Sequence, residues 1–231
     1  MRHPKVVILS AGIGSRLGSP YPKALTPLGN DETIFSRQLR LLRGFDLTIL
    51  VVVGFKKDLI MEADPNVLYV YNTDFDTTNT SKSLYCGLQH IHAEDVLWIN
   101  GDVVFEADII DQMLQQKGSL VVVNNSHVGE EEVKYTTDDL GFIQAISKQV
   151  DEPLGEALGI NLIEARHLGA FKKKLQACHR QDYFERGMEL LTQDIGPVFR
   201  PLSVEDGACV EVDFKEDLQR ANTLVSKISA K

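Results

Sequence analysis

A glycine-rich loop with two cations follows an apolar run near the start of the chain: residues 9–25 read LSAGIGSRLGSPYPKAL. The residues at 5–9, KVVIL, have the β-branched content of a buried strand, and Gly12 and Gly14 remove side chains where the chain turns. Such a loop points backbone N–H groups outward, and oriented N–H groups attract phosphate. On their own, the two glycines are more typical of a plain tight turn. The residues that follow must therefore distinguish a tight turn from a phosphate-binding loop.

Two common phosphate-binding motifs do not fit this loop. The dinucleotide-binding fingerprint needs a third glycine where the chain has Leu17, and the Gly-Lys-Ser/Thr ending of a P-loop does not occur. What remains is a Gly-x-Gly-Ser-Arg motif that ends at Arg16 and is followed by Pro22 and Lys23.

Two aspartates follow apolar runs at distant points of the chain. Asp102 comes after VLWI at 96–99, and Asp213 ends the stretch CVEVD at 209–213. Either could be ordinary, because Gly-Asp pairs suit turns and aspartate caps helices. In open α/β sheets, however, ligands bind outside the carboxyl ends of the strands. Both carboxylates are therefore candidates to face a ligand.

A polar segment at 71–85, YNTDFDTTNTSKSLY, opens a predicted helix. Asn79, Thr80 and Ser83 lie near the start of that helix. Each of them alone is more typical of helix capping. Together they form a hydrogen-bonding cluster next to the glycine loop.

Composition excludes several classes of function. The chain has 231 residues, of which 43% are hydrophobic and 25% charged, as is ordinary for a globular protein. Its net charge of −9 argues against nucleic acid as a partner, because that affinity depends on neutralising phosphates with Lys and Arg. The amino terminus has too short an apolar stretch for a signal peptide or a membrane span, which predicts a cytoplasmic protein with no membrane partner.

The order of the elements predicts an α/β fold with a doubly wound, mostly parallel sheet. Continuous hydrophobicity marks strands that are buried on both faces. Strands are expected at 5–9, 47–53, 67–71, 96–99 and 119–123, with helices near 33–43, 55–62, 81–92 and 107–116. A smaller antiparallel extension is expected beyond residue 130, with strands at 131–137, 142–148, 158–163 and 198–212 and helices near 164–178, 182–193 and after 213. No linker interrupts 1–231, so we expect one domain.

The glycine loop resembles the signature of nucleotidyltransferases that activate sugar phosphates and phospho-alcohols, and the resemblance extends over nearly the whole chain. It rests on Leu9, Gly12, Gly14, Ser15, Arg16, Leu17, Pro22 and Lys23. It implies a Rossmann-like, GT-A-like fold with a nucleotide-binding half at 1–125. It also implies an acceptor-binding half with the C-terminal helix at 126–231.

The resemblance implies roles for the residues described above, which lie in the glycine loop, in the segment 71–85 and around Asp102 and Asp213. Asp102 and Asp213 would hold Mg²⁺, which suits hard oxygen ligands. Arg16 would neutralise the leaving phosphates of a nucleoside triphosphate, and Lys23 would reach its α-phosphate. Residues implied to bind the nucleotide are Leu9, Ala11, Gly12, Gly14, Ser15, Asn79, Thr80 and Ser83.

Further positions resemble the acceptor side of the family. Lys148 in GFIQAISKQV is implied to face the acceptor phosphate, and Glu156 in GEALGI its polar or cationic part. The segment from Asn79 to Leu84 is similar to the choline-phosphate cytidylyltransferase branch. That branch implies CTP as donor, phosphocholine as the leading acceptor, and contacts from Tyr183, Phe184 and Glu185.

Several alternatives stay open on the sequence alone. Tyr183 and Phe184 could be core residues of a helix and not pocket residues. The protein could activate a sugar 1-phosphate, or it could bind a nucleotide as a regulator without turnover. Neither the base, the acceptor nor the oligomeric state follows from the sequence.

Overall fold

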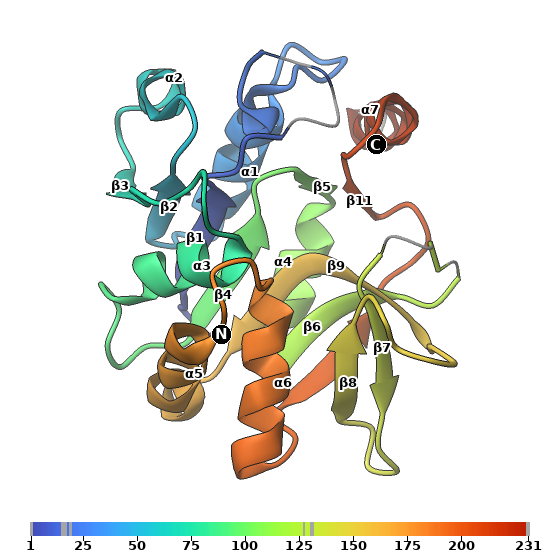
Figure 1. Cartoon of the computed structure of the whole chain (residues 1–231). Helices are drawn as coiled ribbons and strands as arrows, with labels where there is room; N and C mark the ends of the chain where they lie inside the picture. Colours follow the sequence, from blue (N-terminus) through green and yellow to red (C-terminus); the bar gives the residue numbers. More distant parts are fainter. Residues whose placement is uncertain (1, 15–17, 19, 127, 130–131, 230–231) are drawn as a thin grey trace.

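The computed structural model describes residues 2–14, 18, 20–126, 128–129 and 132–229 (Figure 1). Among these residues nine strands form one sheet with the main order β10-β6-β9-β4-β1-β2-β3, while β7 pairs with β9 and with β8. The strands of this sheet are β1 (Lys5–Ser10), β2 (Ile49–Val53), β3 (Leu68–Tyr71), β4 (Val96–Asn100), β6 (Ser119–Asn124), β7 (Lys134–Thr137), β8 (Ile143–Ser147), β9 (Gly155–Ile163) and β10 (Phe199–Ser203). The predicted α/β class with a mostly parallel sheet is confirmed.

Helices cover both faces of this sheet (Figure 1). The described helices are α1 (Ile34–Arg43), α2 (Lys57–Ala63), α3 (Thr80–Leu88), α4 (Ala107–Gln115), α5 (Ala165–Ala177), α6 (Phe184–Ile195) and α7 (Lys215–Ser229). Val6 and Ile8 of β1 pack in the cluster with α1 and α4, and Val7 in the cluster with α3, α5 and α6. Successive side chains of a strand point to opposite faces, which explains the unbroken apolar runs.

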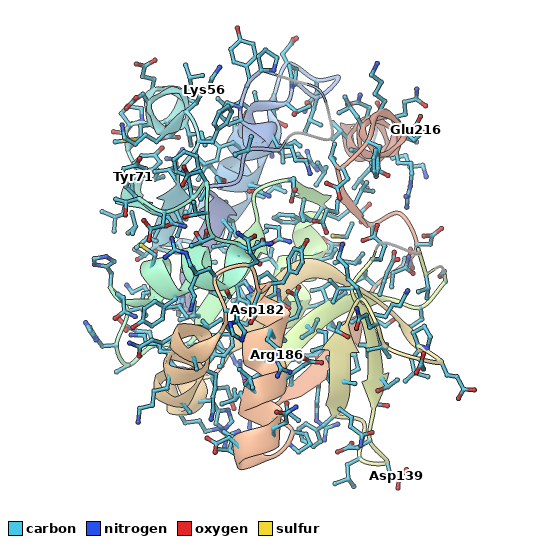
Figure 2. All side chains as sticks on the ribbon, in the orientation of Figure 1. Lys56, Tyr71, Asp139, Asp182, Arg186 and Glu216 are labelled. Atoms are coloured by element: carbon cyan, nitrogen blue, oxygen red, sulfur yellow. The ribbon has the colours of Figure 1, made fainter. Side chains whose placement is uncertain are left out.

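The antiparallel part of the sheet is not only an extension at its edge. β9 lies inside the sheet and runs antiparallel to both β4 and β6, while β10 is parallel to β6. β7 and β8 form the antiparallel extension beside β9, with Asp139 at the tip of their connection (Figure 2). Each of the nine residues of β9 is buried, as expected for a strand between two neighbours.

One predicted strand is wrong. The stretch 198–212 contains two strands, because the chain turns at 206–207, where Gly207 has a φ of 78°. The first is β10, at the edge of the main sheet, and the second is β11 (Cys209–Glu211). β11 pairs antiparallel with β5 (Val103–Phe105), a short strand that the sequence analysis does not predict.

The last helix packs back on the protein as predicted. Ala221, Leu224 and Val225 of α7 are buried in a third cluster with Val104 of β5 and Val210 of β11. The helix therefore holds the β5–β11 pair in place. Within the described part of the chain, the helices are too short or too polar to cross a membrane.

Two helical glycines provide a test of the packing. A Cβ on Gly87 of α3 would lie 2.8 Å from Cγ2 of Val52 and 3.0 Å from Cγ1 of Val7, whereas a Cβ on Gly169 of α5 meets nothing within 4 Å. We expect Gly87→Ala to lower the free energy of unfolding by about 1–2 kcal/mol through overpacking. Gly169→Ala should raise it by about 0.5–1 kcal/mol through helix propensity. Urea unfolding of both variants checks this, and equal effects would contradict the packing of α3 on the sheet.

Candidate active site

A pocket of about 310 Å³ opens at the carboxyl ends of β1 and β4. This is where an open α/β sheet is expected to bind its ligand. Among the residues that the sequence analysis selects, those that line the pocket are Leu9, Gly12, Gly14, Lys23, Thr80, Asp102, Lys148, Tyr183, Phe184, Glu185 and Asp213. The structure thus gathers residues from both halves of the chain around one cavity.

Lys23, Asp102 and Asp213 form the charged centre of the pocket. The Lys23 Nζ donates a hydrogen bond of 2.8 Å to Oδ2 of Asp102 and a second, short one to Oδ1 of Asp213. The Lys23 side chain is only 11% exposed, and the two carboxylates are 20% and 23% exposed. One ammonium therefore joins the two aspartates that the sequence analysis selects as metal ligands.

Backbone pairing brings the two aspartates together. Asp102 lies in the turn between β4 and β5, and β11 pairs with β5 so that Glu211 stands opposite Val103. The pairing continues past the strand, because the N–H of Val212 donates to the carbonyl of Asp102 at 3.0 Å. Asp213 is the next residue, so the β5–β11 ladder sets its distance from Asp102.

Gly101 is required by the close approach of this turn to β1. Its N–H donates to the carbonyl of Leu9 at 2.8 Å, and a Cβ there would collide with Oγ of Ser10. A side chain at 101 would push Asp102 away from the pocket. The glycine before Asp102 therefore places the carboxylate at the end of β1 as well as of β4.

Burial and neighbouring charges shift the pKa values of several groups in and around the charged centre. Burial alone would lower the pKa of Lys23, but the charges and hydrogen bonds of Asp102 and Asp213 outweigh it, and the pKa is raised. Burial, together with the negative charges of both aspartates, raises the pKa of Glu211 well above its ordinary value. Burial and the charge of Glu156 likewise raise the pKa of Glu132. The pocket is thus an acidic environment that favours cations.

The two aspartates fit the Mg²⁺ that the sequence resemblance implies. Their carboxylate oxygens converge on a single cation in the structure, the ammonium of Lys23. Mg²⁺ typically takes one or two carboxylates and completes its octahedron with phosphates and water. Asp102 and Asp213 supply this donor set.

The glycine loop is anchored on one side by the core. Ala11 is 3% exposed and lies outside the pocket lining, and its carbonyl accepts a hydrogen bond of 3.0 Å from the N–H of Phe55. Gly14 has a φ of 65°, and a Cβ there would lie 3.0 Å from Cβ of Lys23. Glycine at this position therefore lets the loop pass directly over Lys23. The predicted contacts of Ser15 and Arg16 lie outside the described residues.

The three polar residues at the start of α3 have different environments. Thr80 lines the pocket, and its Oγ1 accepts a hydrogen bond of 3.1 Å from the N–H of Phe184. Asn79 caps α3 and donates to the carbonyl of Gln181, and Ser83 is buried with its Oγ accepting from Nδ2 of Asn72 at 3.1 Å. Asn79 and Ser83 do not line the pocket. Their polar atoms instead make hydrogen bonds with neighbouring segments around α3.

The start of α6 forms the other end of the pocket, and the label of Asp182 in Figure 2 marks it. Tyr183 is 41% exposed, and the ammonium of Lys148 lies 5.3 Å from the centre of its ring. Phe184 is 1% exposed, and its ring packs edge-on against Trp98 at 5.7 Å. Glu185 is 8% exposed, and burial raises its pKa to about 7.

Glu156 lies outside the pocket lining. It is buried in β9, and its Oε2 accepts a hydrogen bond of 3.1 Å from the N–H of Gly129. Its predicted contact with the acceptor stays a prediction.

The pocket also contains residues to which the sequence analysis assigns no role. Ser10 and Asn100 end the strands β1 and β4, and each has a buried side-chain oxygen without a hydrogen-bond partner among the described residues. Glu132 and Glu211 add two carboxylates. A signal existed for Glu211 in the sequence, because it lies two residues before Asp213 in the alternating stretch CVEVD, and alternate residues of an extended chain project to the same face.

Comparison with known proteins identifies the family to which the chain belongs. The family described as the MobA-like NTP transferase domain matches residues 6–188. A CMP-5'-(3-aminopropyl)phosphonate synthase of Streptomyces rubellomurinus is 34% identical over 119 residues, which are 47% of this chain and 19% of that protein. A bifunctional protein GlmU of Methanococcus maripaludis is 29% identical over 165 residues, which are 69% of this chain and 38% of that protein. The chain thus spans well under half the length of either relative.

Solved structures share the fold at low sequence identity. The CTP:phosphocholine cytidylyltransferase LicC of Streptococcus pneumoniae has a TM-score of 0.76 and 19% identity, and the match covers 97% of this chain and 100% of that chain. The inositol-1-phosphate CTP transferase of T. maritima has a TM-score of 0.80 and 14% identity, covering 99% and 97%. At such identities the likeness concerns the fold alone.

Proposed function

Because this chain belongs to the MobA-like NTP transferase domain family, we propose that it is a nucleotidyltransferase that joins the CMP part of CTP to a small phosphorylated alcohol or amine. The observation that carries this proposal is the cluster of Lys23, Asp102 and Asp213 beside the glycine loop, in the pocket at the strand ends. A protein that only bound a nucleotide would not need both carboxylates.

The proposed reaction is an in-line displacement at phosphorus. An oxygen of the acceptor phosphate attacks the α-phosphorus of the nucleoside triphosphate and forms a new P–O bond. The bond from the α-phosphorus to the bridging oxygen breaks, and pyrophosphate leaves with the electron pair. A phosphate monoester is already a nucleophile at neutral pH, so the protein needs no general base.

The residues then act by positioning and by neutralising charge. Mg²⁺ bound by Asp102 and Asp213 would supply positive charge to the nucleotide phosphates. Lys23 adjoins these carboxylates and would neutralise the α-phosphate, and Arg16 would do so for the leaving phosphates. Residues 1–125 would hold the nucleotide, with Thr80 facing it from α3.

Three observations support CTP as the donor. The segment from Asn79 to Leu84 is similar to the cytidylyltransferase branch, and one curated relative is named for a CMP product. Both structural neighbours compared above are named for CTP. On the acceptor side, Lys148 would face the phosphate, while Tyr183 and Glu185 would suit a cationic head group, and phosphocholine is one of the acceptors to be tested.

The test is pyrophosphate release in Mg²⁺ with each of the four NTPs and dTTP. The acceptor panel would contain phosphocholine, phosphoethanolamine, glycerol 3-phosphate and glucose 1-phosphate. We expect CTP with a phospho-alcohol or phospho-amine to give the highest kcat/KM, and Asp102→Asn serves as the control for contaminating activity. A preference for glucose 1-phosphate would instead make the protein a sugar-phosphate nucleotidyltransferase. Nucleotide binding without pyrophosphate release in any mixture would indicate a regulatory protein.

A further inference from the structure

Glu185 is a buried carboxylate whose hydrogen bonds are incomplete. It lines the pocket and is 8% exposed, and its Oε2 has no hydrogen-bond partner among the described residues. A buried oxygen of this kind destabilises the folded protein when it is left unpaired, and more so when it is charged. Glu185 lies in the first turn of α6, where the helix dipole favours a negative charge but does not supply the missing donor. The position therefore favours a ligand that donates N–H bonds.

The aromatic surface beside Glu185 is too small to enclose a trimethylammonium group. The ring of Phe184 is 1% exposed and is packed between core residues that include Trp98 and Met188. This leaves Tyr183, at 41% exposure, as the aromatic face at this end of the pocket. A quaternary ammonium has no N–H group and depends on ring faces for its recognition, so one exposed ring gives it little.

A primary ammonium already lies at this end of the pocket. The Nζ of Lys148 is 5.3 Å from the centre of the Tyr183 ring, and its charge also acts on Glu185. A lysine head group has the same chemistry as a protonated aminoalkyl chain, with three N–H donors on one nitrogen. The surroundings of Tyr183 and Glu185 therefore already hold one –NH₃⁺ group.

We infer that the acceptor end of the pocket selects a primary ammonium, so that the acceptor is a small phosphate monoester or phosphonate carrying –NH₃⁺ and not a trimethylammonium compound. This rests on the proposed function. Glu185 would accept from the ammonium, Tyr183 would face it, and Lys148 would contact the –PO₃ group. A charge-assisted hydrogen bond to a buried carboxylate is about twice as strong as a neutral one, and methylation of the nitrogen removes it.

The experiment is a methylation series of acceptors with CTP. Phosphoethanolamine and its mono-, di- and trimethyl derivatives, the last being phosphocholine, keep the positive charge while the N–H donors are removed stepwise. We expect kcat/KM to fall by at least about tenfold from the first to the last, the value of one charge-assisted hydrogen bond. A parallel measurement with 2-aminoethylphosphonate distinguishes a phosphonate from a phosphate ester as the natural class. A flat series, or a preference for phosphocholine, would overturn the inference and leave the proposed function intact.

Two variants assign the effect to Glu185. Glu185→Gln should flatten the methylation series, because the amide keeps the shape but loses the charge. Asp194→Asn is the matched control, since it removes a carboxylate near the far end of α6 that pairs with Lys174 at 2.9 Å, and it should keep the wild-type ratio. Thermal unfolding checks that both variants are folded. If no acceptor supports pyrophosphate release, the proposed function fails. Calorimetric titration of the same series into the wild type then measures the affinity for each acceptor, and an affinity that does not fall with methylation would overturn the inference.

The same selectivity should depend on pH. Burial raises the pKa of Glu185 to about 7, and the other charged groups acting on it are Lys148 after β8 and Glu189 on α6. Below this value Glu185 is neutral, so its attraction for an ammonium is lost as the pH falls from 8 to 6. The ratio of kcat/KM for phosphoethanolamine over glycerol 3-phosphate should therefore rise with pH, while titration of the phosphate largely cancels in the ratio. A ratio independent of pH would contradict the role of Glu185.

Discussion

Replacement of either Asp102 or Asp213 by asparagine is expected to lower kcat for pyrophosphate release by at least about a hundredfold, which is of order 3 kcal/mol. The reason is that both carboxylates converge on one cation in the pocket. An amide preserves the shape of either side chain but removes the negative charge that would hold Mg²⁺. The measurement is steady-state kinetics at saturating Mg²⁺, with EDTA abolishing the activity of the wild type.

Asp58→Asn is the matched control for these two variants, because Asp58 is exposed and pairs with Lys57 on the surface of α2. It should leave kcat unchanged. Binding of Mn²⁺, followed by electron paramagnetic resonance, gives a second readout that does not depend on turnover. Full activity in EDTA, or wild-type kcat in both variants, would remove the assignment of a metal site to this carboxylate pair.

Lys23→Ala is expected to lower kcat by about a hundredfold while KM for the nucleotide changes by less than about threefold, because a cation at the reacting phosphate acts mainly on the transition state. Lys23 is 11% exposed and lines the pocket between the glycine loop and the two aspartates. Lys57→Ala is the control, since Lys57 pairs with a surface carboxylate. A raised KM with an unchanged kcat would assign Lys23 to ground-state binding instead.

The ion pairs of Lys23 add a prediction for the same variant. In the structure its ammonium occupies the point on which the two carboxylates converge, so it competes there with a divalent cation. Lys23→Ala should therefore bind Mn²⁺ at least as tightly as the wild type, although it turns over more slowly. Weaker Mn²⁺ binding would show that the lysine organises the carboxylates and does not compete for them.

The sequence by itself determined most of the helices and strands and the family. Unbroken apolar runs such as 49–53 report burial on both faces of a strand, and the spacing in 215–225 reports one buried helix face, because these patterns depend only on local geometry. The glycine loop and the aspartates were found because they directly follow apolar runs. Their predicted roles in binding and catalysis remain predictions.

Only the tertiary structure decided which of these residues meet. Asp102 and Asp213 come together through the pairing of β5 with β11, and β5 was not predicted because three residues are too few for a periodic signal. The position of β9 between β4 and β6 could not be predicted from the sequence either, since hydrophobicity shows that a strand has neighbours but not which strands they are.

At the start of α6, too, the tertiary structure decides which individual side chains face the pocket. Tyr183, Phe184 and Glu185 are consecutive, and their types alone suggested an aromatic site with a carboxylate. In the structure, the orientation of α6 about its axis places Phe184 in the core beside Trp98 and leaves Tyr183 exposed, while Glu185 is buried at the pocket. That orientation is set by packing against α5 and the sheet, contacts between residues far apart in the chain. For this reason the residue types were readable in the sequence, but the chemistry of the acceptor end was decided by the fold.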